Sequence, residues 1–245
     1  MRRGSSMIRC TLTVFAVLAL ACSMAIAQPG DLLFHASFDE SHHPDFTAGP
    51  ATTQSQSSVT TGGGGRIGEA LVAYRGFRGI EPFLAPSYLT AGNIDREQGT
   101  IELWIKPGEG LFDDPEERRV YIHWWVERDR KLAPKVFRID TRGGNLRIFE
   151  QDVADAGYSS HMQIPVDWRP GEWHHVAYTW AEGGRIVYID RVEMGRSQPG
   201  RGLPRLGEIF TIGAGSWGFD YAQALVDEAY IWNRALTPDE FGGLE

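Results

Sequence analysis

Apolar and polar residues alternate in short runs along most of the chain after residue 30. In residues 99–106, the odd positions from Ile101 to Ile105 are aliphatic, whereas the even positions from Glu102 to Lys106 are charged or aromatic. A period of two residues is typical of a β-strand that presents one face to a core and the other face elsewhere. This segment is therefore predicted to be a strand with a buried aliphatic face.

Comparable runs, bounded by glycine, proline or other turn residues, predict the remaining strands. They cover residues 31–38, 68–74, 80–84, 120–126, 135–140, 146–149, 158–165, 173–180, 185–190, 208–212 and 224–232. Paired glycines after residues 142 and 182 indicate two hairpins. About a dozen short strands without parallel crossovers predict an all-β fold, a β-sandwich of two antiparallel sheets.

The last predicted strand, residues 224–232, leads into a helical signal. Thr237 and Glu240 have the spacing of a capping box, and Pro238 occupies the first helical position, where no N–H is needed. One short C-terminal helical turn is predicted here, with Phe241 placed to pack back on the strands.

Seven segments, taken in order, resemble the laminin-G-like (LamG) jelly rolls of the concanavalin A-like lectin/glucanase superfamily. They are residues 33–39, 68–72, 99–107, 172–180, 188–190, 212–214 and 224–241. The resemblance covers nearly all of the chain after residue 30 and implies an antiparallel jelly-roll sandwich. Because this fold is found in lectins, adhesion modules, hydrolases and lyases, the resemblance leaves the function open.

Residues 1–27 have the features of a secretory signal peptide. Three arginines form a basic start, an apolar run follows, and Ala-Ile-Ala ends the segment as a cleavage pattern. The apolar run is too short for a membrane span, so no transmembrane segment is expected. The alternative is a bacterial lipoprotein attached through Cys22. In either case the mature domain is expected to be secreted, periplasmic or at the cell surface.

The mature chain, residues 28–245, is predicted to be a single LamG-like domain. Its length suits one β-sandwich with a substantial core. Residues 40–66 are rich in Ser, Thr, Gln and Gly and predict a flexible loop within the domain. Both cysteines, Cys10 and Cys22, precede the mature domain, so a disulfide framework is excluded.

The chain is acidic, with 24 Lys and Arg, 32 Asp and Glu, and a net charge of −8. Three of the basic residues and none of the acidic ones precede residue 28, so the mature domain carries 21 basic and 32 acidic side chains, a net charge of −11. Such a domain is not expected to bind nucleic acid or anionic lipid.

Asp39 and Asp227 are the candidate metal ligands. Asp39 ends the first predicted strand, and Asp227 interrupts an apolar run, where an unpaired carboxylate is costly. The resemblance implies that the first and last strands are neighbours and that a structural calcium ion (Ca2+) sits at the sandwich edge, with these two acids as ligands. The alternative is that Asp227 or Glu228 bonds backbone N–H groups or pairs with Arg234.

Aromatic side chains are the candidates for ligand binding, because sugar sites combine exposed rings with hydrogen-bonding groups. Trp125 is one of two adjacent tryptophans in a predicted strand, so one of the pair faces away from the core. Trp217 lies in a glycine-rich loop. With Arg118, Arg128 and Asp220 as polar neighbours, these tryptophans predict a ligand-binding surface on the concave sheet and its loops.

The other aromatic residues in predicted strands favour packing. Core positions are expected for Trp104, Trp173, Trp180 and Trp232, because strands of the resembled family carry aromatic residues there. The adjacent histidines at residues 174–175 are expected on opposite faces of a strand, one buried and one at the surface.

Catalysis is not expected. Glucanases of the resembled superfamily carry a Glu-x-Asp-x-Glu strand, and no such pattern occurs here. The leading hypothesis is a secreted, non-catalytic lectin-like module that binds a polysaccharide or glycoconjugate. The alternatives are a module that binds an extracellular protein in adhesion or assembly, and a glycan-active hydrolase or lyase with an unrecognised site.

Overall fold

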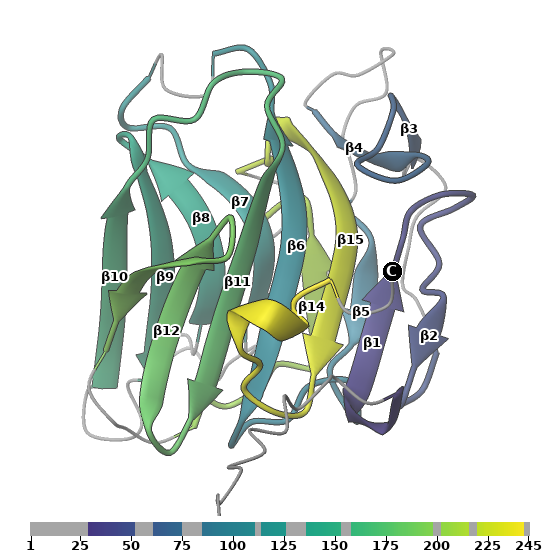
Figure 1. Ribbon diagram of the computed structural model, residues 1–245, viewed down its shortest axis with the longest axis vertical. Coiled ribbons are helices and arrows are strands. Elements are labelled where there is room, and N and C mark those ends of the chain that lie inside the picture. The colour runs from purple at the N-terminus through teal and green to yellow at the C-terminus, as the bar shows by residue number, and fades with distance from the viewer. Residues whose placement is uncertain are drawn as a thin grey trace, which may run out of the picture.

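The computed structural model describes residues 29–51, 61–74, 85–110, 114–125, 136–152, 158–197, 202–215 and 220–242. For Trp125, Asp152 and residues 158–161 it describes the backbone. The described chain forms two antiparallel sheets that pack face to face, so the predicted all-β sandwich is confirmed (Figure 1).

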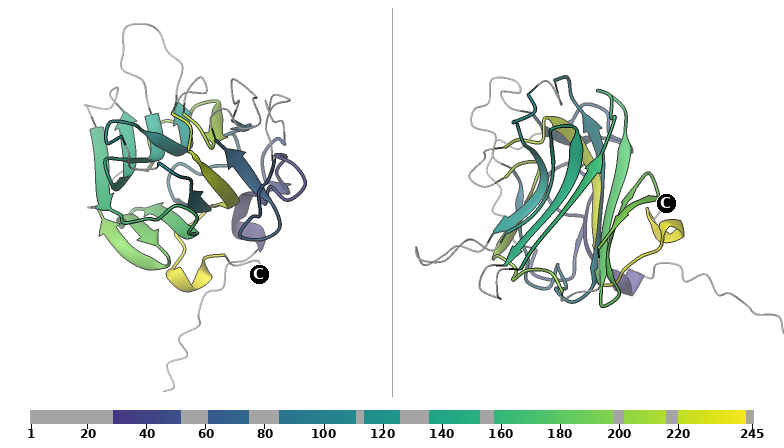
Figure 2. Two further views of the ribbon diagram at one scale, coloured as in Figure 1. Left: turned by 90° about the horizontal axis from the view of Figure 1, so that it is seen from above. Right: turned by 90° about the vertical axis from the view of Figure 1, so that its left-hand side faces the viewer.

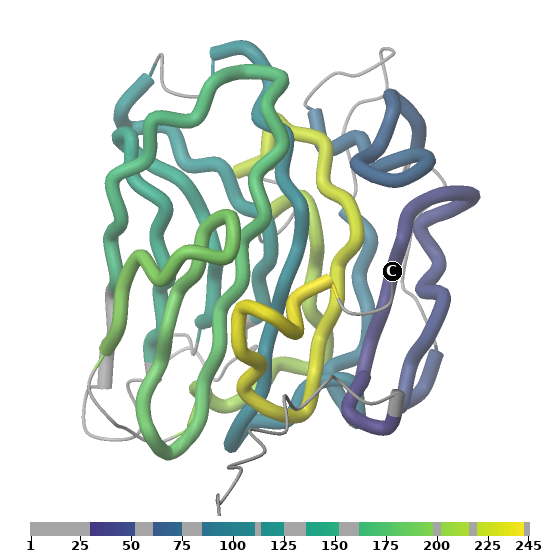
Figure 3. Tube along the Cα trace, in the orientation of Figure 1, coloured from purple at the N-terminus to yellow at the C-terminus, as the bar shows by residue number. Residues whose placement is uncertain are grey.

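One sheet has nine strands. Its main path is β13-β12-β11-β6-β15-β1-β2, while β4 also pairs with β15 and β3 pairs with β4. The strands are β1 (Leu32–Ala36), β2 (Phe46–Thr47), β3 (Thr61–Gly62), β4 (Ala70–Ala73), β6 (Gly99–Pro107), β11 (His174–Ala181), β12 (Gly184–Ile189), β13 (Val192–Arg196) and β15 (Ala224–Trp232). The first and last strands, β1 and β15, lie side by side as predicted (Figure 3).

The other sheet has six strands in the order β10-β9-β8-β7-β14-β5. They are β5 (Ser87–Leu89), β7 (Arg119–Trp125), β8 (Val136–Arg142), β9 (Asn145–Asp152), β10 (Tyr158–Pro165) and β14 (Ile209–Ile212). The predicted strand at 80–84 lies outside the described residues. The sequence pattern did not predict β2, β3 or β5, which have only two or three residues, or β13, which is mostly exposed.

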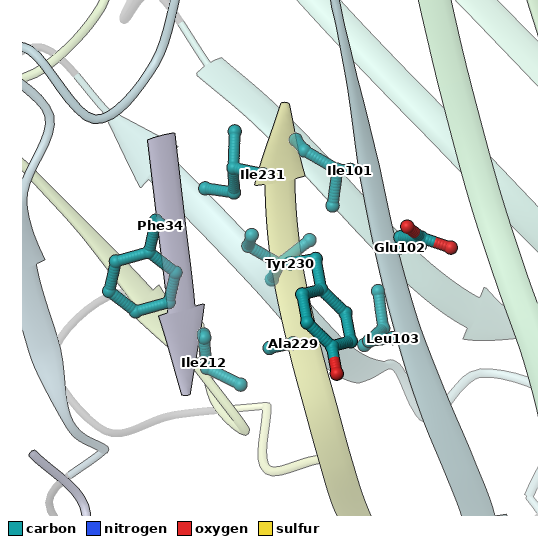
Figure 4. Close-up of a pocket in the computed structure, with 9 residues that line it drawn as sticks. Phe34, Ile101, Glu102, Leu103, Ile212, Ala229, Tyr230 and Ile231 are labelled. Carbon is teal, nitrogen blue, oxygen red and sulfur yellow. The ribbon is translucent and has the colours of Figure 1, made fainter. Parts of the chain in front are cut away.

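The core lies between the two sheets. Ile101, Leu103 and Ile105 of β6 are buried there, as their alternation predicted, and Trp124 of the opposite sheet joins them. The cavity in Figure 4, lined by Phe34, Ile101 and seven other residues, measures about 10 Å³. That is no more than the space of one water molecule. A ligand of sugar size has no room in this cavity, so the outer faces and edges are the surfaces to consider.

A 3-10 turn, η4 (Pro238–Glu240), follows β15 and covers part of the outer face of the nine-stranded sheet (Figure 2, right). The Thr237 backbone N–H donates to the Glu240 carboxylate at 2.8 Å, which satisfies an N-terminal donor as the capping box predicted. Phe241 packs edge-on against Tyr188 of β12. A second 3-10 turn, η1 (Pro29–Asp31), precedes β1. None of the helical turns in the described ranges has the length and apolarity that a membrane-crossing helix needs.

Candidate functional site

Three arginines surround one buried carboxylate on the outer face of the six-stranded sheet. In β8, Phe137 and Ile139 point into the core, so Arg138 and Asp140 point outward. Asp140 pairs in register with Arg147 of β9. We call Arg118, Arg138, Asp140 and Arg147 the Asp140 cluster.

The Asp140 carboxylate is fully buried, and both of its oxygens are engaged. Arg147 Nε donates to Oδ1 at 2.5 Å, and Arg138 Nε donates to Oδ2. Arg118 Nε lies 3.8 Å from Oδ2, an ion-pair distance without a hydrogen bond. Charged hydrogen bonds of this kind fix both partners, so the cluster holds its guanidinium groups in place at the sheet surface.

The guanidinium group of Arg138 also packs on an aromatic ring. It lies over the Phe149 ring of β9, with 4.4 Å between the guanidinium carbon and the ring centroid. Arg138 and Phe149 are register partners in β8 and β9. A ring and a planar cation stacked in this way form a rigid pair that presents both apolar and donor surface.

Two of the predicted ligand-binding residues meet at the edge of this cluster. Arg118 Nη1 donates to Asp220 Oδ2 at 3.0 Å, although 102 positions separate the two residues in sequence. Asp220 is held by its backbone as well, because its carbonyl accepts from the N–H of Val120. The structure thus brings Arg118 and Asp220 together beside β7.

His123 lies in β7 opposite Arg138 of β8. Burial, and after it the neighbouring charges of Arg138 and Arg118, lower the pKa of its imidazole to about 4. The side chain is therefore neutral at neutral pH, and it adds no positive charge to the surface.

The remaining predicted ligand-binding residues are not placed as side chains. The backbone of Trp125 ends β7 opposite Val136 of β8, and its side chain lies outside the described residues. Trp217 and Arg128 also lie outside them. All three remain predictions.

The predicted metal ligands Asp39 and Asp227 bind the same backbone loop. Asp227 Oδ2 accepts from the N–H groups of Arg66 and Ile67 at 2.6 and 3.2 Å. Asp39 Oδ1 accepts from the N–H of Glu69 at 2.9 Å. The Asp227 contacts are the backbone bonding that was the predicted alternative to calcium, and the Asp39 contact is of the same kind.

Asp227 sits at a β-bulge between β15 and β6 and is fully buried. Its other oxygen, Oδ1, accepts from the N–H of Glu228, a residue with φ of 47°. Burial raises the pKa of the Asp227 carboxyl to about 7, and the hydrogen bonds from Ile67 and Arg66 act in the opposite direction.

Calcium takes six to eight oxygen ligands. N–H donors point at Asp227, and no group of three or more His, Cys, Asp or Glu in the described parts of the chain is placed to hold a metal ion. The described residues therefore do not fit a calcium site, and the ion stays a prediction. Thermal melting in calcium and in EDTA tests it: an unchanged Tm contradicts the predicted ion.

The outer face of the nine-stranded sheet holds a different set of aromatic residues. Trp180 and Trp232 are buried, as expected. Trp104 and Trp173 are half-buried rather than buried, with the Arg66 guanidinium over the Trp104 ring and the Lys106 ammonium over the Trp173 ring. Core positions were expected for both tryptophans. They are only half-buried because they lie on the outward face of the sheet, at positions that η4 does not cover.

The paired histidines occupy opposite faces, as predicted. His175 Nε2 bonds the buried Glu102 carboxylate at 3.0 Å. His174 is half-buried, with Nδ1 3.0 Å from Asp190 and its ring stacked on Trp168. Both have structural partners.

Asp140 and Arg147 are the site residues that the sequence reading missed. Alternation within residues 136–142 and 145–152 shows which side chains share a face of each strand. It does not show which residue of β8 lies opposite which residue of β9. The cross-strand register that joins Asp140 to Arg147 is visible in the structure.

Two antiparallel sheets, with a polar outer face on one of them, define a sandwich of the lectin and glucanase type. The model of the concanavalin A-like lectin/glucanases superfamily matches residues 86–241. The chain belongs to this superfamily. A search of curated proteins finds no match.

Solved structures show the same fold at low sequence identity. Domain 4 of AbnA, a GH43 extracellular arabinanase from Geobacillus stearothermophilus, in complex with arabinotriose, is 20% identical, with a TM-score of 0.60, and the match covers 86% of this chain and 97% of that chain. The binding domain of Paraclostridial Mosquitocidal Protein 1 is 16% identical, with a TM-score of 0.63, over 86% of this chain and 51% of that one.

The botulinum neurotoxin serotype G binding domain is 12% identical, with a TM-score of 0.62, over 86% of this chain and 49% of that one. This chain therefore spans about half the length of the toxin binding domains that it matches. At these identities the matches show the fold alone.

Proposed function

We propose that the protein is a non-catalytic carbohydrate-binding module whose binding surface is the outer face of β7, β8 and β9. The observation that carries the proposal is the Asp140 cluster, a set of outward guanidinium groups fixed beside the Phe149 ring. Sugar hydroxyls accept hydrogen bonds from arginine, and the C–H faces of a sugar ring pack on aromatic rings. The predicted ligand-binding residues Arg118 and Asp220 extend this surface. Trp125, also predicted, is the last residue of β7.

The carboxylates at this surface do not suit hydrolysis. The usual glycosidase places two carboxyl groups on either side of the bond that it cleaves, one as acid and one as nucleophile or base. Asp140 is fully buried and bonded to arginines, and Asp220 is bonded to Arg118. Both acids are already engaged, which supports a binding role.

The place of action follows from the predicted leader at residues 1–27. Export by this leader would put the domain outside the cytoplasm, where polysaccharides and glycoconjugates are available. The arabinotriose complex of a domain with the same fold is in keeping with a carbohydrate ligand.

A protein-binding role has a different observation in its favour. Val192 and Met194 of the edge strand β13 are exposed, at 59% and 45%. Apolar residues on an unpaired strand edge suit contact with another chain. This adhesion or assembly function is the second candidate.

Binding to a polysaccharide panel tests the proposal. We expect the protein to bind at least one glycan, and Arg138→Gln to weaken that binding about tenfold, because a charged hydrogen bond contributes roughly 1.5–3 kcal/mol. Arg196→Gln is the matched control, since Arg196 lies in β13 of the nine-stranded sheet and pairs with Glu193 there. Full binding by the Arg138 variant, or no binding to any glycan, would contradict the proposal.

A further inference from the structure

We infer that the Asp140 cluster selects acidic carbohydrate, a glycan that carries carboxylate or sulfate groups. This inference rests on the proposed function and adds the class of ligand to it. It follows from the balance of charge at the cluster, from the positions of its arginines and from the state of His123.

Positive charge exceeds negative charge at this surface. Arg118, Arg138 and Arg147 converge on Asp140, and Asp220 is the carboxylate bonded to the outermost arginine. Three guanidinium groups therefore face two carboxylates, whereas the chain as a whole has a net charge of −8. A surplus cation in an acidic protein is a local feature of this surface.

Three other arginines of the described chain have carboxylates to match them. Arg185 pairs with the buried Glu150, and Arg196 pairs with Glu193. Arg234 has two acidic partners, Asp31 and Glu240. At these three places the carboxylates equal or outnumber the arginine, whereas at the Asp140 cluster the arginines outnumber the carboxylates.

One arginine of the cluster, Arg118, makes no hydrogen bond to Asp140 and remains partly exposed to solvent. The two oxygens of Asp140 are taken by Arg147 and Arg138. Arg118 Nε is left 3.8 Å away, buried and without a hydrogen-bond partner among the described residues, so a ligand can reach only the rest of this guanidinium group. Its side chain is 29% exposed, and its other contact is to Asp220, whose side chain is 41% exposed. An incoming anion can share Arg118 with Asp220 or displace that exposed carboxylate.

Arginine is suited to this role because its planar fork of donors matches the oxygens of a carboxylate or sulfate. Arg118 and Arg138 both remain partly exposed, at 29% and 17% of their side chains. The Phe149 ring fixes the plane of Arg138. A ligand anion therefore meets donors that are already oriented, so little entropy is lost on binding.

His123 reports the same surplus of charge. The imidazole lies opposite Arg138 in the strand pair; burial is the main cause of its lowered pKa, and the charges of Arg138 and Arg118 lower that pKa as well. A ligand anion that neutralises these arginines must make protonation of His123 easier. The inference thus predicts a rise in the pKa of His123 when an acidic glycan binds.

The experiment compares matched glycans that differ in charge. The protein, expressed from the full chain, is titrated with polygalacturonate and with its methyl ester, and in a second pair with dextran sulfate and dextran. We expect at least tenfold tighter binding to the charged member of one pair. The pair that shows the preference identifies the anion as carboxylate or sulfate.

Two variants locate the preference. Arg118→Gln keeps Asp140 bonded to Arg138 and Arg147, so the fold is retained, and it should reduce the charged-to-neutral affinity ratio toward one. Arg196→Gln, which changes the Arg196–Glu193 pair on the nine-stranded sheet, should keep the ratio. The His123 pKa, followed by NMR, should rise when the charged glycan binds to the unmodified protein.

The outcomes separate the inference from the proposed function. Equal binding to both members of each pair, or an unchanged ratio in Arg118→Gln, overturns the inference and leaves a carbohydrate-binding module. No binding to these or any other glycans overturns the proposed function as well.

Discussion

At the scale of single residues, Asp227 shows how a buried acid organises a loop. Its carboxylate accepts N–H groups from Arg66, Ile67 and Glu228. Asp39 accepts the N–H of Glu69 from the same loop. Together the two acids hold residues 66–69 by hydrogen bonds to their backbone.

The raised pKa of Asp227 makes a pH-dependent prediction. Burial raises the folded-state pKa from 3.8 to about 7, so between these values the folded protein binds more protons than the unfolded chain. Stability contributed by this group therefore falls as pH rises from about 4 to 7, by roughly 1.4 kcal/mol for each pKa unit.

The Asp227→Asn variant isolates this effect, because asparagine does not titrate. We expect the free energy of unfolding of the unmodified protein, relative to the variant, to be a few kcal/mol higher at pH 5 than at pH 8. Urea unfolding at the two pH values measures it. A difference between the two proteins that does not change with pH would show that Asp227 keeps an ordinary pKa.

Gly68 tests the Asp39 contact. It has φ of +55°, and a Cβ there would lie 1.9 Å from Asp39 Oδ1. Gly68→Ala should lower the free energy of unfolding by about 2–4 kcal/mol, because it adds displacement of the carboxylate to a left-handed backbone penalty of about 1–2 kcal/mol.

Gly64→Ala is the matched control for Gly68→Ala. Gly64 also has a positive φ, of +71°, but nothing lies within 4 Å of its added Cβ. Chemical denaturation should show the smaller loss for Gly64→Ala. Equal losses would mean that the Asp39 contact contributes nothing beyond backbone strain.

At the scale of elements, η4 is held to the nine-stranded sheet by charged groups. The Glu240 carboxylate, with 4% of its side chain exposed, accepts from Arg234 and from the Thr237 N–H. Arg234 also bonds Asp31 before β1. These contacts join the two ends of the described chain across one face.

Glu240→Gln should loosen this turn. The variant loses the ion pair with Arg234, and we expect a loss of about 1–3 kcal/mol in the free energy of unfolding. The amide of Gly242, which donates to Glu102, should exchange its hydrogen faster. Asp239→Asn, an exposed change in the same turn, is the control. Unchanged exchange at Gly242 in the Glu240 variant would contradict a clamping role.

The elements were largely predictable from the sequence. Alternation in residues 99–106 predicted which side chains of β6 are buried, and the capping-box spacing predicted η4. The bulge at Asp227 was not predictable, since it arises from pairing with β6. Edge strand β13 was missed because Val192 and Met194 are exposed, so no apolar alternation marks a buried face.

The candidate site was less predictable than the fold. Arg118 and Asp220 were chosen as polar neighbours of tryptophans, and the structure joins them by a hydrogen bond. Their contact depends on how the segment before β15 returns to β7. The pairing of Asp140 with Arg147 depends on strand register. Neither the Arg118–Asp220 contact nor the Asp140–Arg147 pairing can be predicted from the spacing of residues within one segment.

At the scale of the whole molecule, the two sheets have different outer faces. The nine-stranded sheet is partly covered by η4 and by the loop that Asp39 and Asp227 hold (Figure 1). The six-stranded sheet presents the Asp140 cluster. The central claim is that this second face binds the ligand.

NMR mapping of a bound glycan tests that claim most directly. Titration with the tightest-binding glycan should shift the signals of His123, Arg138 and Arg147 on the six-stranded sheet. The indole signals of Trp104 and Trp173 on the opposite face should not move. Shifts confined to those two tryptophans, with the Asp140 cluster unchanged, would place binding on the other face and contradict the account.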